Sequence, residues 1–168
     1  MRDGNAEGAG PMGPADSSGV RIFPPLIYAG GLVAGFLLQL VWPLGFSAGS
    51  WTPLIRLAGI LMVVAGLLLV LWATGKFHEA GTPANPRKPT TALVLSGPYR
   101  FSRNPMYLGL TLVQAGIALL TDALWPLITL IPVLWIVRRE VIEREENYLA
   151  AKFGEVYLKY KASVRRWI

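Results

Sequence analysis

The sequence contains no cysteine, a single histidine and few charged residues. Without cysteine, the 168-residue chain has no disulfide, no thiolate nucleophile and no cysteine-based zinc site. Only 15% of its residues are charged and 53% are hydrophobic, which is more apolar side chain than a soluble domain of this length can bury. The length leaves room for one domain. The composition therefore indicates a single-domain integral-membrane protein.

The sequence also lacks the common nucleotide-binding and metal-binding motifs. It has no phosphate-binding glycine loop, no dinucleotide-binding glycine pattern after a strand, and no second histidine with which His78 would hold a metal. His78 is most simply interpreted as a solvated loop residue, with a proton-transfer role as the alternative. The net charge of +6 comes from basic residues that flank apolar runs, which is typical of membrane topology signals. We therefore expect no metal and no nucleic-acid partner.

Four apolar runs predict an all-α integral-membrane fold with about four transmembrane helices and no Rossmann domain. A helix needs roughly 20 apolar residues to cross a bilayer. The runs cover approximately residues 24–42, 54–74, 105–121 and 124–140. Residues 1–20, which are rich in glycine, alanine, proline and serine, predict a disordered tail. Residues 21–168 are expected to form one membrane domain.

Individual residues refine these spans. Gly30, Gly31 and Gly35 either allow a neighbouring helix to approach the first span or are ordinary membrane-helix composition. The segment Gly75–Ser96 predicts a loop because it contains three prolines. Pro132 should kink the fourth span.

The remaining signals concern turns and the C-terminal end. Asp122 marks a tight turn between the third and fourth spans. Helix-forming residues continue past the fourth span, so residues 141–168 predict a cytoplasmic amphipathic arm that is interrupted at Gly154. This arm either lies on the membrane surface or folds back over the bundle.

The distribution of charge predicts the orientation in the membrane. With four spans, the N-terminal tail, the segment Gly75–Ser96 and the C-terminal arm lie on one side, which holds every lysine and arginine except Arg56. Positive charge accumulates in cytoplasmic segments. We therefore expect a multi-pass protein, in the inner membrane if the host is bacterial, whose polar end faces the cytoplasm.

The segment Gly97–Gly109, called the junction below, connects a basic loop to an apolar helix. Asn104 is placed to cap this helix and Pro105 suits its first turn. Arg100 and Arg103 lie at the edge of lipid, where an arginine is costly unless it is paired. Tyr107, Thr111 and Gln114 follow at helical spacing and predict a polar stripe on the same helix.

The arm supplies carboxylates on the same side of the membrane. Glu145 and Glu146, together with the junction arginines, predict a pocket for a zwitterionic ligand, because arginine binds a carboxylate and glutamate binds an ammonium group or ribose hydroxyls. The alternative is that the arginines are topology signals and the glutamates form helix pairs such as Arg139 with Glu143.

At these residues the sequence resembles the isoprenylcysteine carboxyl methyltransferase family, including its small bacterial members and the related phospholipid methyltransferases. The resemblance covers about residues 97–164. Its first motif is Gly97-Pro98-Tyr99-Arg100 followed by Arg103-Asn104-Pro105-Met106-Tyr107-Leu108-Gly109. Its second motif comprises Glu145-Glu146, Leu149, Phe153-Gly154, Tyr157, Tyr160 and Val164.

The resemblance implies an integral-membrane methyltransferase that uses S-adenosylmethionine, with a cofactor pocket open to the cytoplasm and a lipophilic acceptor that enters from the bilayer. It assigns cofactor binding to Tyr99, Arg100, Arg103, Asn104, Pro105, Tyr107, Leu108, Gly109, Glu145 and Glu146. We expect catalysis to depend on Arg103 and Glu146. We expect acceptor binding to involve Arg103 together with Thr111 and Gln114 of the polar stripe. Many members have histidine where this chain has Asn104, which cannot carry a proton at neutral pH.

A carboxylate is the favoured acceptor, as in isoprenylcysteine O-methylation, with a phospholipid amine or a thiol as the alternative. A carboxylate is already nucleophilic, and Arg103 or Arg100 would orient it. A phospholipid amine or a thiol must first lose a proton, for which only His78, Glu145 and Glu146 are available.

Two other classes of protein remain as alternatives. One is an NADPH-dependent membrane reductase, because sterol-type reductases resemble this family in their C-terminal region. The other is a non-catalytic membrane module that binds lipid through its basic arm. The basic residues of the arm are Lys152, Lys159, Lys161, Arg165 and Arg166.

Overall fold

The computed structural model describes residues 17–46 and 52–167, and all regular secondary structure within these ranges is helical. The helices are α1 (Pro24–Val41), α2 (Thr52–Glu79), η1 (Gly97–Arg100), α3 (Pro105–Leu120), α4 (Leu124–Ile128), α5 (Leu130–Ile136), η2 (Val137–Ile142) and α6 (Glu143–Ser163). The short η1 is a 3₁₀ helix and η2 is a π-helical segment. The predicted all-α class is confirmed for the described residues. Most of the predicted N-terminal tail, residues 1–16, lies outside them.

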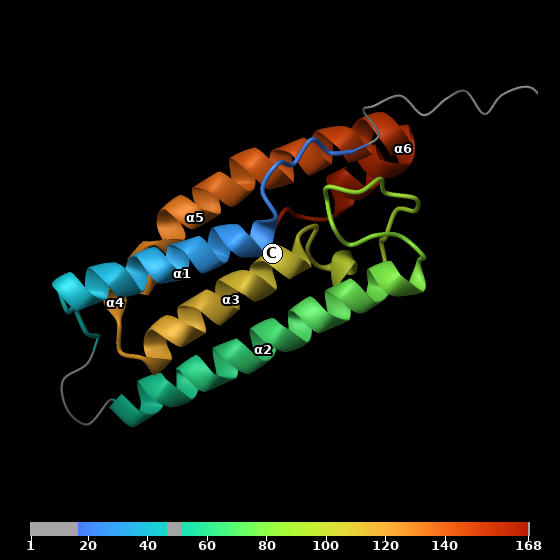
Figure 1. Ribbon diagram of the computed structural model, residues 1–168. Coiled ribbons are helices and arrows are strands. Elements are labelled where there is room, and N and C mark those ends of the chain that lie inside the picture. The colour runs from blue at the N-terminus through green and yellow to red at the C-terminus, as the bar shows by residue number, and fades with distance from the viewer. Residues whose placement is uncertain (1–16, 47–51, 168) are drawn as a thin grey trace, which may run out of the picture.

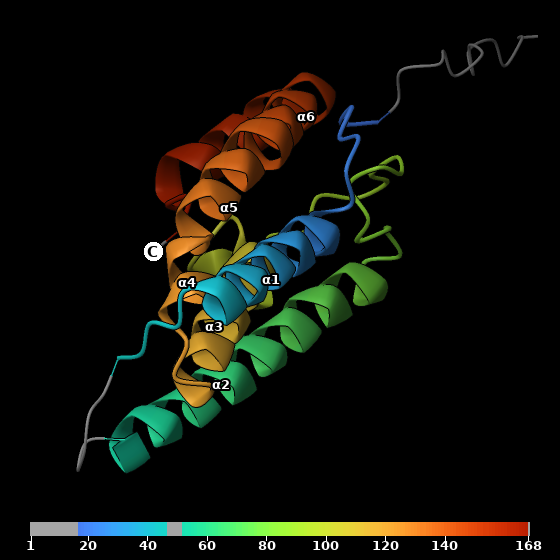
Figure 2. The same cartoon turned by 60° about the vertical axis from the view of Figure 1, so that its left-hand side comes forward.

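The long helices run nearly side by side, and α3 lies between α1 and α2 (Figures 1 and 2). The start of α1, the end of α2, the start of α3 and all of α6 gather at one end of the bundle (Figure 1). This end therefore unites the loop after α2, the junction and the C-terminal arm, as the alternation of the spans predicts. At the opposite end, the segments that follow α1 and α3 are joined by the hydrogen bond from the Phe46 N–H to Asp122 Oδ1 at 2.8 Å.

Glycines spaced seven residues apart bring α2 and α3 into backbone contact. A Cβ atom at Gly66 would lie 2.5 Å from the carbonyl oxygen of Gly109, and one at Gly59 would lie 2.8 Å from that of Gly116. Seven residues are close to two helical turns, so both pairs lie on one seam between the antiparallel helices. The helices can approach this closely only because no side chain separates them.

The first span uses its glycines in a similar way. A Cβ atom at Gly31 would clash with Val133, and one at Gly35 would lie 2.5 Å from the Cα atom of Pro126, so α4 and α5 pack directly on α1. Gly30 has open space around it. The close-approach interpretation is therefore correct for two of the three glycines.

The fourth span is broken, as its interior proline predicts. Thr129 separates α4 from α5, three residues before Pro132. Gln114 Nε2 donates to the carbonyl oxygen of Pro126 at 3.0 Å. The Thr129 hydroxyl shares its one proton between the same oxygen, at 3.0 Å, and the carbonyl oxygen of Gly31, at 2.9 Å. Neighbouring side chains thus satisfy a carbonyl at the break. The helix then continues through η2 into α6, and Gly154 (φ 53°, ψ −131°) kinks α6 where the sequence predicts an interruption.

The prediction of a loop from Gly75 onward is wrong for its first five residues, because α2 continues to Glu79. Lys76 Nζ lies 2.6 Å from Glu79 Oε2 across this last turn. The ring of Phe77 packs edge-on against Tyr99 of η1, with 5.4 Å between the ring centroids. These contacts stabilise the extra turn, and the irregular loop begins at Ala80.

Two of the described helices, α1 and α2, are long and apolar enough to cross a membrane. In their most apolar windows only 17% and 11% of the residues are buried, so they do not resemble core helices of a soluble protein. The 16 residues of α3 span about 24 Å at the usual rise per residue, which is less than the roughly 30 Å of bilayer hydrocarbon. The number of four spans therefore stays a prediction.

Candidate functional site

The junction is held against both α2 and α6. Gly97 begins η1 with a φ of 63°, a backbone conformation that favours glycine. The turn buries Tyr99, which is 5% exposed, against Phe77. The Tyr160 hydroxyl on α6 donates to the carbonyl oxygen of Tyr99 at 2.7 Å. Two elements distant in sequence thus fix the segment that precedes α3.

Asn104 occupies the predicted cap position of α3, but its side chain does not cap the helix. Its Nδ2 atom instead donates to the carbonyl oxygen of Arg166 at 2.9 Å, near the C-terminus. The Asn104 N–H is satisfied by Ser102 Oγ at 3.1 Å. The capping prediction was wrong because a long-range acceptor competes for the amide, while Pro105 does occupy the first turn as predicted.

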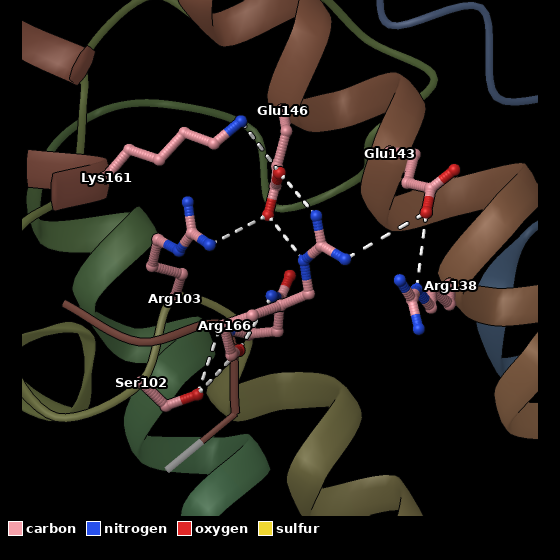
Figure 3. A network of polar contacts seen from close by, with 8 residues as sticks. Ser102, Arg103, Arg138, Glu143, Glu146, Lys161 and Arg166 are labelled. Carbon is pink, nitrogen blue, oxygen red and sulfur yellow. Dashed lines mark hydrogen bonds and ion pairs between the residues drawn. The ribbon is translucent and has the colours of Figure 1, made fainter.

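Glu146 lies at the centre of a charged network in which three basic side chains point toward it (Figure 3). Arg166 Nε donates to Oε1 and Arg166 Nη2 to Oε2, both at 2.9 Å. Lys161 Nζ lies 3.1 Å from Oε2, and Arg103 Nη2 lies 3.3 Å from Oε1. Burial opposes ionisation of Glu146, but these hydrogen bonds and charges outweigh it and lower its pKa below the ordinary value. Glu146 is therefore an anion at neutral pH.

Arg103 keeps unused hydrogen-bonding capacity in this network. Its side chain is only 10% exposed, and its Nε and Nη1 atoms are buried with no hydrogen-bond partner among the residues that the structure describes. The hydroxyl of Tyr99 is likewise buried and unpaired. Buried donors in folded proteins are nearly always paired, so unpaired ones call for an explanation such as an absent ligand.

Glu145 is tied to α3 rather than to the basic cluster. The Tyr107 hydroxyl donates to its Oε2 at 2.9 Å. The residue keeps some exposed surface, but its carboxyl group is enclosed, and this burial raises the pKa of Glu145 to about 7. The hydrogen bond from Tyr107 lowers the pKa, and the charge of Glu146 raises it. Two adjacent carboxyl groups therefore differ in charge near neutral pH.

One pocket, called the junction pocket below, brings the predicted residues of the two motifs together. Its walls come from the junction, α3, α6 and the loop after α2. Its polar lining residues include Tyr99, Arg103, Asn104, Tyr107, Glu145 and Glu146. The Arg103 and Glu145–Glu146 neighbourhoods therefore face each other, as the sequence predicts.

The other predicted site residues lie outside this pocket. Arg100 is exposed, and Pro105 is buried in the first turn of α3. Gly109 faces Gly66 on the seam with α2, where its Cβ would lie 2.7 Å from the Gly66 carbonyl oxygen. Gln114 is 1% exposed and is bonded to Pro126.

Leu108 and Thr111 line a second cavity of about 430 Å³ between α3 and α5. Leu134, Trp135, Arg138 and Trp167 complete its walls. Thr111 Oγ1 also donates to the carbonyl oxygen of Tyr107 at 2.8 Å, so its hydroxyl is engaged within α3. Of the predicted polar stripe, Tyr107 lines the junction pocket, Thr111 lines this cavity, and Gln114 is buried inside the helix bundle.

Sequence reasoning assigned no site role to Lys161, Arg166 or Tyr157, although Tyr157 belongs to the second motif. Lys161 and Arg166 were interpreted as part of a basic membrane-binding surface, whereas both contact Glu146. Tyr157 is 2% exposed and lines the junction pocket. The available signal for Lys161 and Arg166 was their positive charge near the end of the arm, which could compensate the charge of Glu146. His78 is exposed and does not line the pocket.

Part of the alternative interpretation is also correct. Arg139 Nη1 lies 3.5 Å from Glu143 Oε2, so the predicted helix pair exists next to the pocket. Glu143 also contacts Arg138 at 3.3 Å. The alternative interpretation is therefore correct for Glu143, which pairs with arginines of its own helix. Glu145 and Glu146 line the junction pocket instead.

Comparison with known proteins places this geometry in a family. The sequence matches the family described as phospholipid methyltransferase over residues 54–156, which is more than half of the chain and includes the junction and both glutamates. The chain belongs to this methyltransferase family. The resemblance predicted from the two motifs is thereby confirmed.

Two relatives extend the match. The chain is 32% identical over 124 residues to protein-S-isoprenylcysteine O-methyltransferase of Saccharomyces cerevisiae, which covers 71% of this chain and 51% of the yeast protein. It therefore spans about half the length of that relative. It is 36% identical over 63 residues to an uncharacterized protein of Haemophilus influenzae, which covers 38% of this chain and 100% of that protein. No solved structure matches the chain.

Proposed function

We propose that this protein is an integral-membrane methyltransferase that uses S-adenosylmethionine and methylates a lipophilic acceptor. The observation that carries the proposal is that Arg103 and Tyr99, which both line the junction pocket, keep buried donors without a partner among the described residues, namely Arg103 Nε and Nη1 and the Tyr99 hydroxyl. The cofactor is a zwitterion with a carboxylate and an ammonium group. Arg103 would bind the carboxylate, and Glu145 would bind the ammonium group or the ribose hydroxyls.

The chemistry of the pocket fits this cofactor, whereas its size requires a movement. The enclosed volume is about 80 Å³, which is below the roughly 300–1,000 Å³ of typical ligand pockets. The loop after α2 supplies Pro83, Pro86 and Thr90 to the wall, and Ser18 bonds to Pro86 from the N-terminal side. This irregular wall is the part that would move outward when the cofactor binds.

The bound cofactor would supply an electrophilic methyl group, so the protein needs mainly to align the acceptor and exclude water. We propose a carboxylate acceptor, as in isoprenylcysteine O-methylation, because a carboxylate needs no base. The cavity lined by Leu108, Trp135 and Trp167 supports a lipophilic acceptor, because its walls are mainly apolar and it borders the start of α3. Arg138 at its wall would favour an anionic group.

A phospholipid amine is the second candidate, and Glu145 is the observation that favours it. An amine must lose a proton before it attacks, and an efficient general base has a pKa near the working pH. The pKa of Glu145 is raised to about 7 by burial. In this reaction Glu145 would act as the base instead of binding the ammonium group of the cofactor, whereas His78 lies outside the pocket.

The proposal includes four membrane spans with the junction pocket at the cytoplasmic side. The exposed apolar surfaces of α1 and α2 support membrane insertion. The basic residues around Glu146 lie at the end of the bundle where the loop, junction and arm meet, which agrees with the rule that positive charge stays in the cytoplasm.

Binding of S-adenosylhomocysteine to the detergent-purified protein tests the cofactor. Isothermal titration should show binding that Arg103→Ala and Glu146→Gln both weaken. Absence of binding in protein that still unfolds cooperatively would contradict the proposal. Protection from thermal unfolding by NADPH instead would favour the reductase alternative.

Incubation of membranes with methyl-labelled cofactor, followed by identification of the lipid-soluble product, would distinguish a methyl ester from a methylated amine or thiol. Absence of any labelled product would favour a non-catalytic lipid-binding module.

A further inference from the structure

The last residues of the described chain fold back over the junction. The α6 helix ends at Ser163, and Val164 is extended, with φ −119° and ψ 133°. We call residues Val164–Trp167 the C-terminal strap. The Arg103 N–H donates to the carbonyl oxygen of Arg165 at 3.0 Å. The strap is thus hydrogen-bonded to the backbone of the residue whose side chain carries the unpaired donors.

Two side chains of the junction hold the next carbonyl of the strap. Asn104 Nδ2 donates to the carbonyl oxygen of Arg166 at 2.9 Å, and Ser102 Oγ donates to the same oxygen at 3.3 Å. The contact between Ser102 and Arg166 can be followed in Figure 3. Because these bonds fix the backbone of Arg166, they also fix the origin of its side chain. Asn104 therefore acts on the site through the strap.

The guanidinium of Arg166 engages both oxygens of Glu146. The two hydrogen bonds are each 2.9 Å long, and together they form a bidentate pair, which fixes the plane of a carboxylate as well as its position. Arg166 Nη1 also lies 3.9 Å from Glu143 Oε1. Among the described residues, three cations contact Glu146, and of these Arg166 alone contacts both oxygens within hydrogen-bond distance.

This arrangement explains why Arg103 retains free donors beside a carboxylate. Only Arg103 Nη2 contacts Glu146, at 3.3 Å, while Nε and Nη1 stay unpaired. If Glu146 were not held by Arg166, it could turn and pair with these donors, since an unpaired buried donor is costly. The carboxylate of Glu146 would then occupy the position that an incoming carboxylate needs.

We propose, on the basis of the proposed function, that Arg166 is a positioning residue that holds Glu146 away from the free donors of Arg103 and so keeps the carboxylate-binding position of the pocket open. Loss of Arg166 leaves Glu146 paired with Arg103 and Lys161, so the charge stays compensated. The effect of Arg166 is therefore on ligand binding through the orientation of Glu146.

Arg166→Lys tests this role, because lysine keeps the charge but is a single point donor without the planar fork. Arg165→Lys is the matched control, because its side chain is exposed and only its backbone carbonyl contacts the junction. Isothermal titration with S-adenosylhomocysteine should show binding at least about tenfold weaker in Arg166→Lys and unchanged in Arg165→Lys, a tenfold change being 1.4 kcal/mol. Unchanged affinity in Arg166→Lys would overturn the inference.

Two further measurements separate positioning from a general structural role. Decarboxylated S-adenosylmethionine lacks the group that Arg103 would bind, so its affinity should be nearly the same in the wild type and in Arg166→Lys. In a Glu146→Gln background, Arg166→Lys should add little further loss of S-adenosylhomocysteine binding. Equal losses for both ligands, or additive losses in the double variant, would overturn the inference. Failure of the wild-type protein to bind either ligand would instead contradict the proposed function.

Discussion

The hydroxyl of Tyr107 on α3 donates to Glu145 Oε2 on α6 at 2.9 Å, and this bond joins the two motifs of the family inside one pocket. The two residues are 38 positions apart in the sequence. The bond stabilises the charged form of a carboxyl group whose burial favours the neutral form. The charge of Glu145 is therefore set by a balance that pH and mutation can shift.

Cofactor affinity should depend on pH through Glu145. With a pKa of about 7, the carboxylate is a minor form at about pH 6 and the major form at about pH 8. If the carboxylate binds the ammonium group, affinity for S-adenosylhomocysteine should rise about tenfold over this range. Glu145→Gln should bind weakly and with little pH dependence, as titrations at several pH values would check. Glu146 cannot mimic this effect because its pKa is lowered. A pH dependence that persists in Glu145→Gln would contradict the prediction.

Tyr107→Phe should move this pH dependence upward. The tyrosine hydroxyl lowers the pKa of Glu145, so its removal leaves burial and the charge of Glu146 to raise that pKa above about 7. The midpoint of the affinity increase should therefore lie at higher pH than in the wild type. Affinity at pH well above the midpoint should change less, because the carboxylate is then present in both proteins. An unchanged or lower midpoint would show that the hydrogen bond does not control this ionisation.

The seam between α2 and α3 should tolerate no side chain. Gly66→Ala places a Cβ 2.5 Å from the Gly109 carbonyl oxygen, so the helices must separate. Such overpacking costs about 1–3 kcal/mol, against a gain of up to about 1 kcal/mol in helix propensity. Thermal unfolding in detergent should therefore occur at lower temperature. Gly75→Ala on the same helix is the control, since its Cβ meets open space and should leave the unfolding temperature unchanged or higher.

The sequence predicts the parts of this site that local pattern controls. The junction and the glutamate pair carry recognisable motifs, and helical periodicity with span alternation brings Arg103 and Glu146 to one end of the bundle. Their contact at 3.3 Å is therefore an outcome that the sequence anticipates. The break before Pro132 and the kink at Gly154 could also be predicted from the sequence, because proline and glycine change the backbone conformation at or near their own positions.

The misread parts depend on long-range contacts that no local pattern encodes. Asn104 has the chemistry of a helix cap, but the carbonyl of Arg166 takes its amide. Arg166 resembles any basic residue of a surface arm until the strap folds back onto Glu146. The polar residues after Gly75 resemble a loop, but the ring of Phe77 packs on Tyr99 and keeps the helix intact. In each case a partner distant in sequence decides the local structure.

Gln114→Leu should separate stability from activity. Gln114 was predicted to contact the acceptor, yet its amide donates to the Pro126 carbonyl beside the helix break. Leucine would remove this bond. The single Thr129 proton is shared between the carbonyls of Pro126 and Gly31, so one of these buried acceptors would lose its donor, at a cost of about 1–3 kcal/mol. The unfolding temperature should fall while the KM for the acceptor, measured on folded protein, stays unchanged. A raised KM with unchanged stability would support the acceptor-binding interpretation instead.

The absence of cysteine makes the membrane topology directly testable. Lys88→Cys and Pro43→Cys introduce single thiols at exposed positions on opposite sides of α2, and the wild-type chain provides a background without labelling. With four spans and a cytoplasmic junction pocket, a membrane-impermeant thiol reagent should label Pro43→Cys in intact bacterial spheroplasts. It should label Lys88→Cys only after the membrane is permeabilised. Labelling of both positions from the same side would mean that α2 does not cross the bilayer, and the pocket would then need another orientation. Labelling of Lys88→Cys alone in intact spheroplasts would place the pocket outside the cytoplasm, where S-adenosylmethionine made in the cell could not reach it directly.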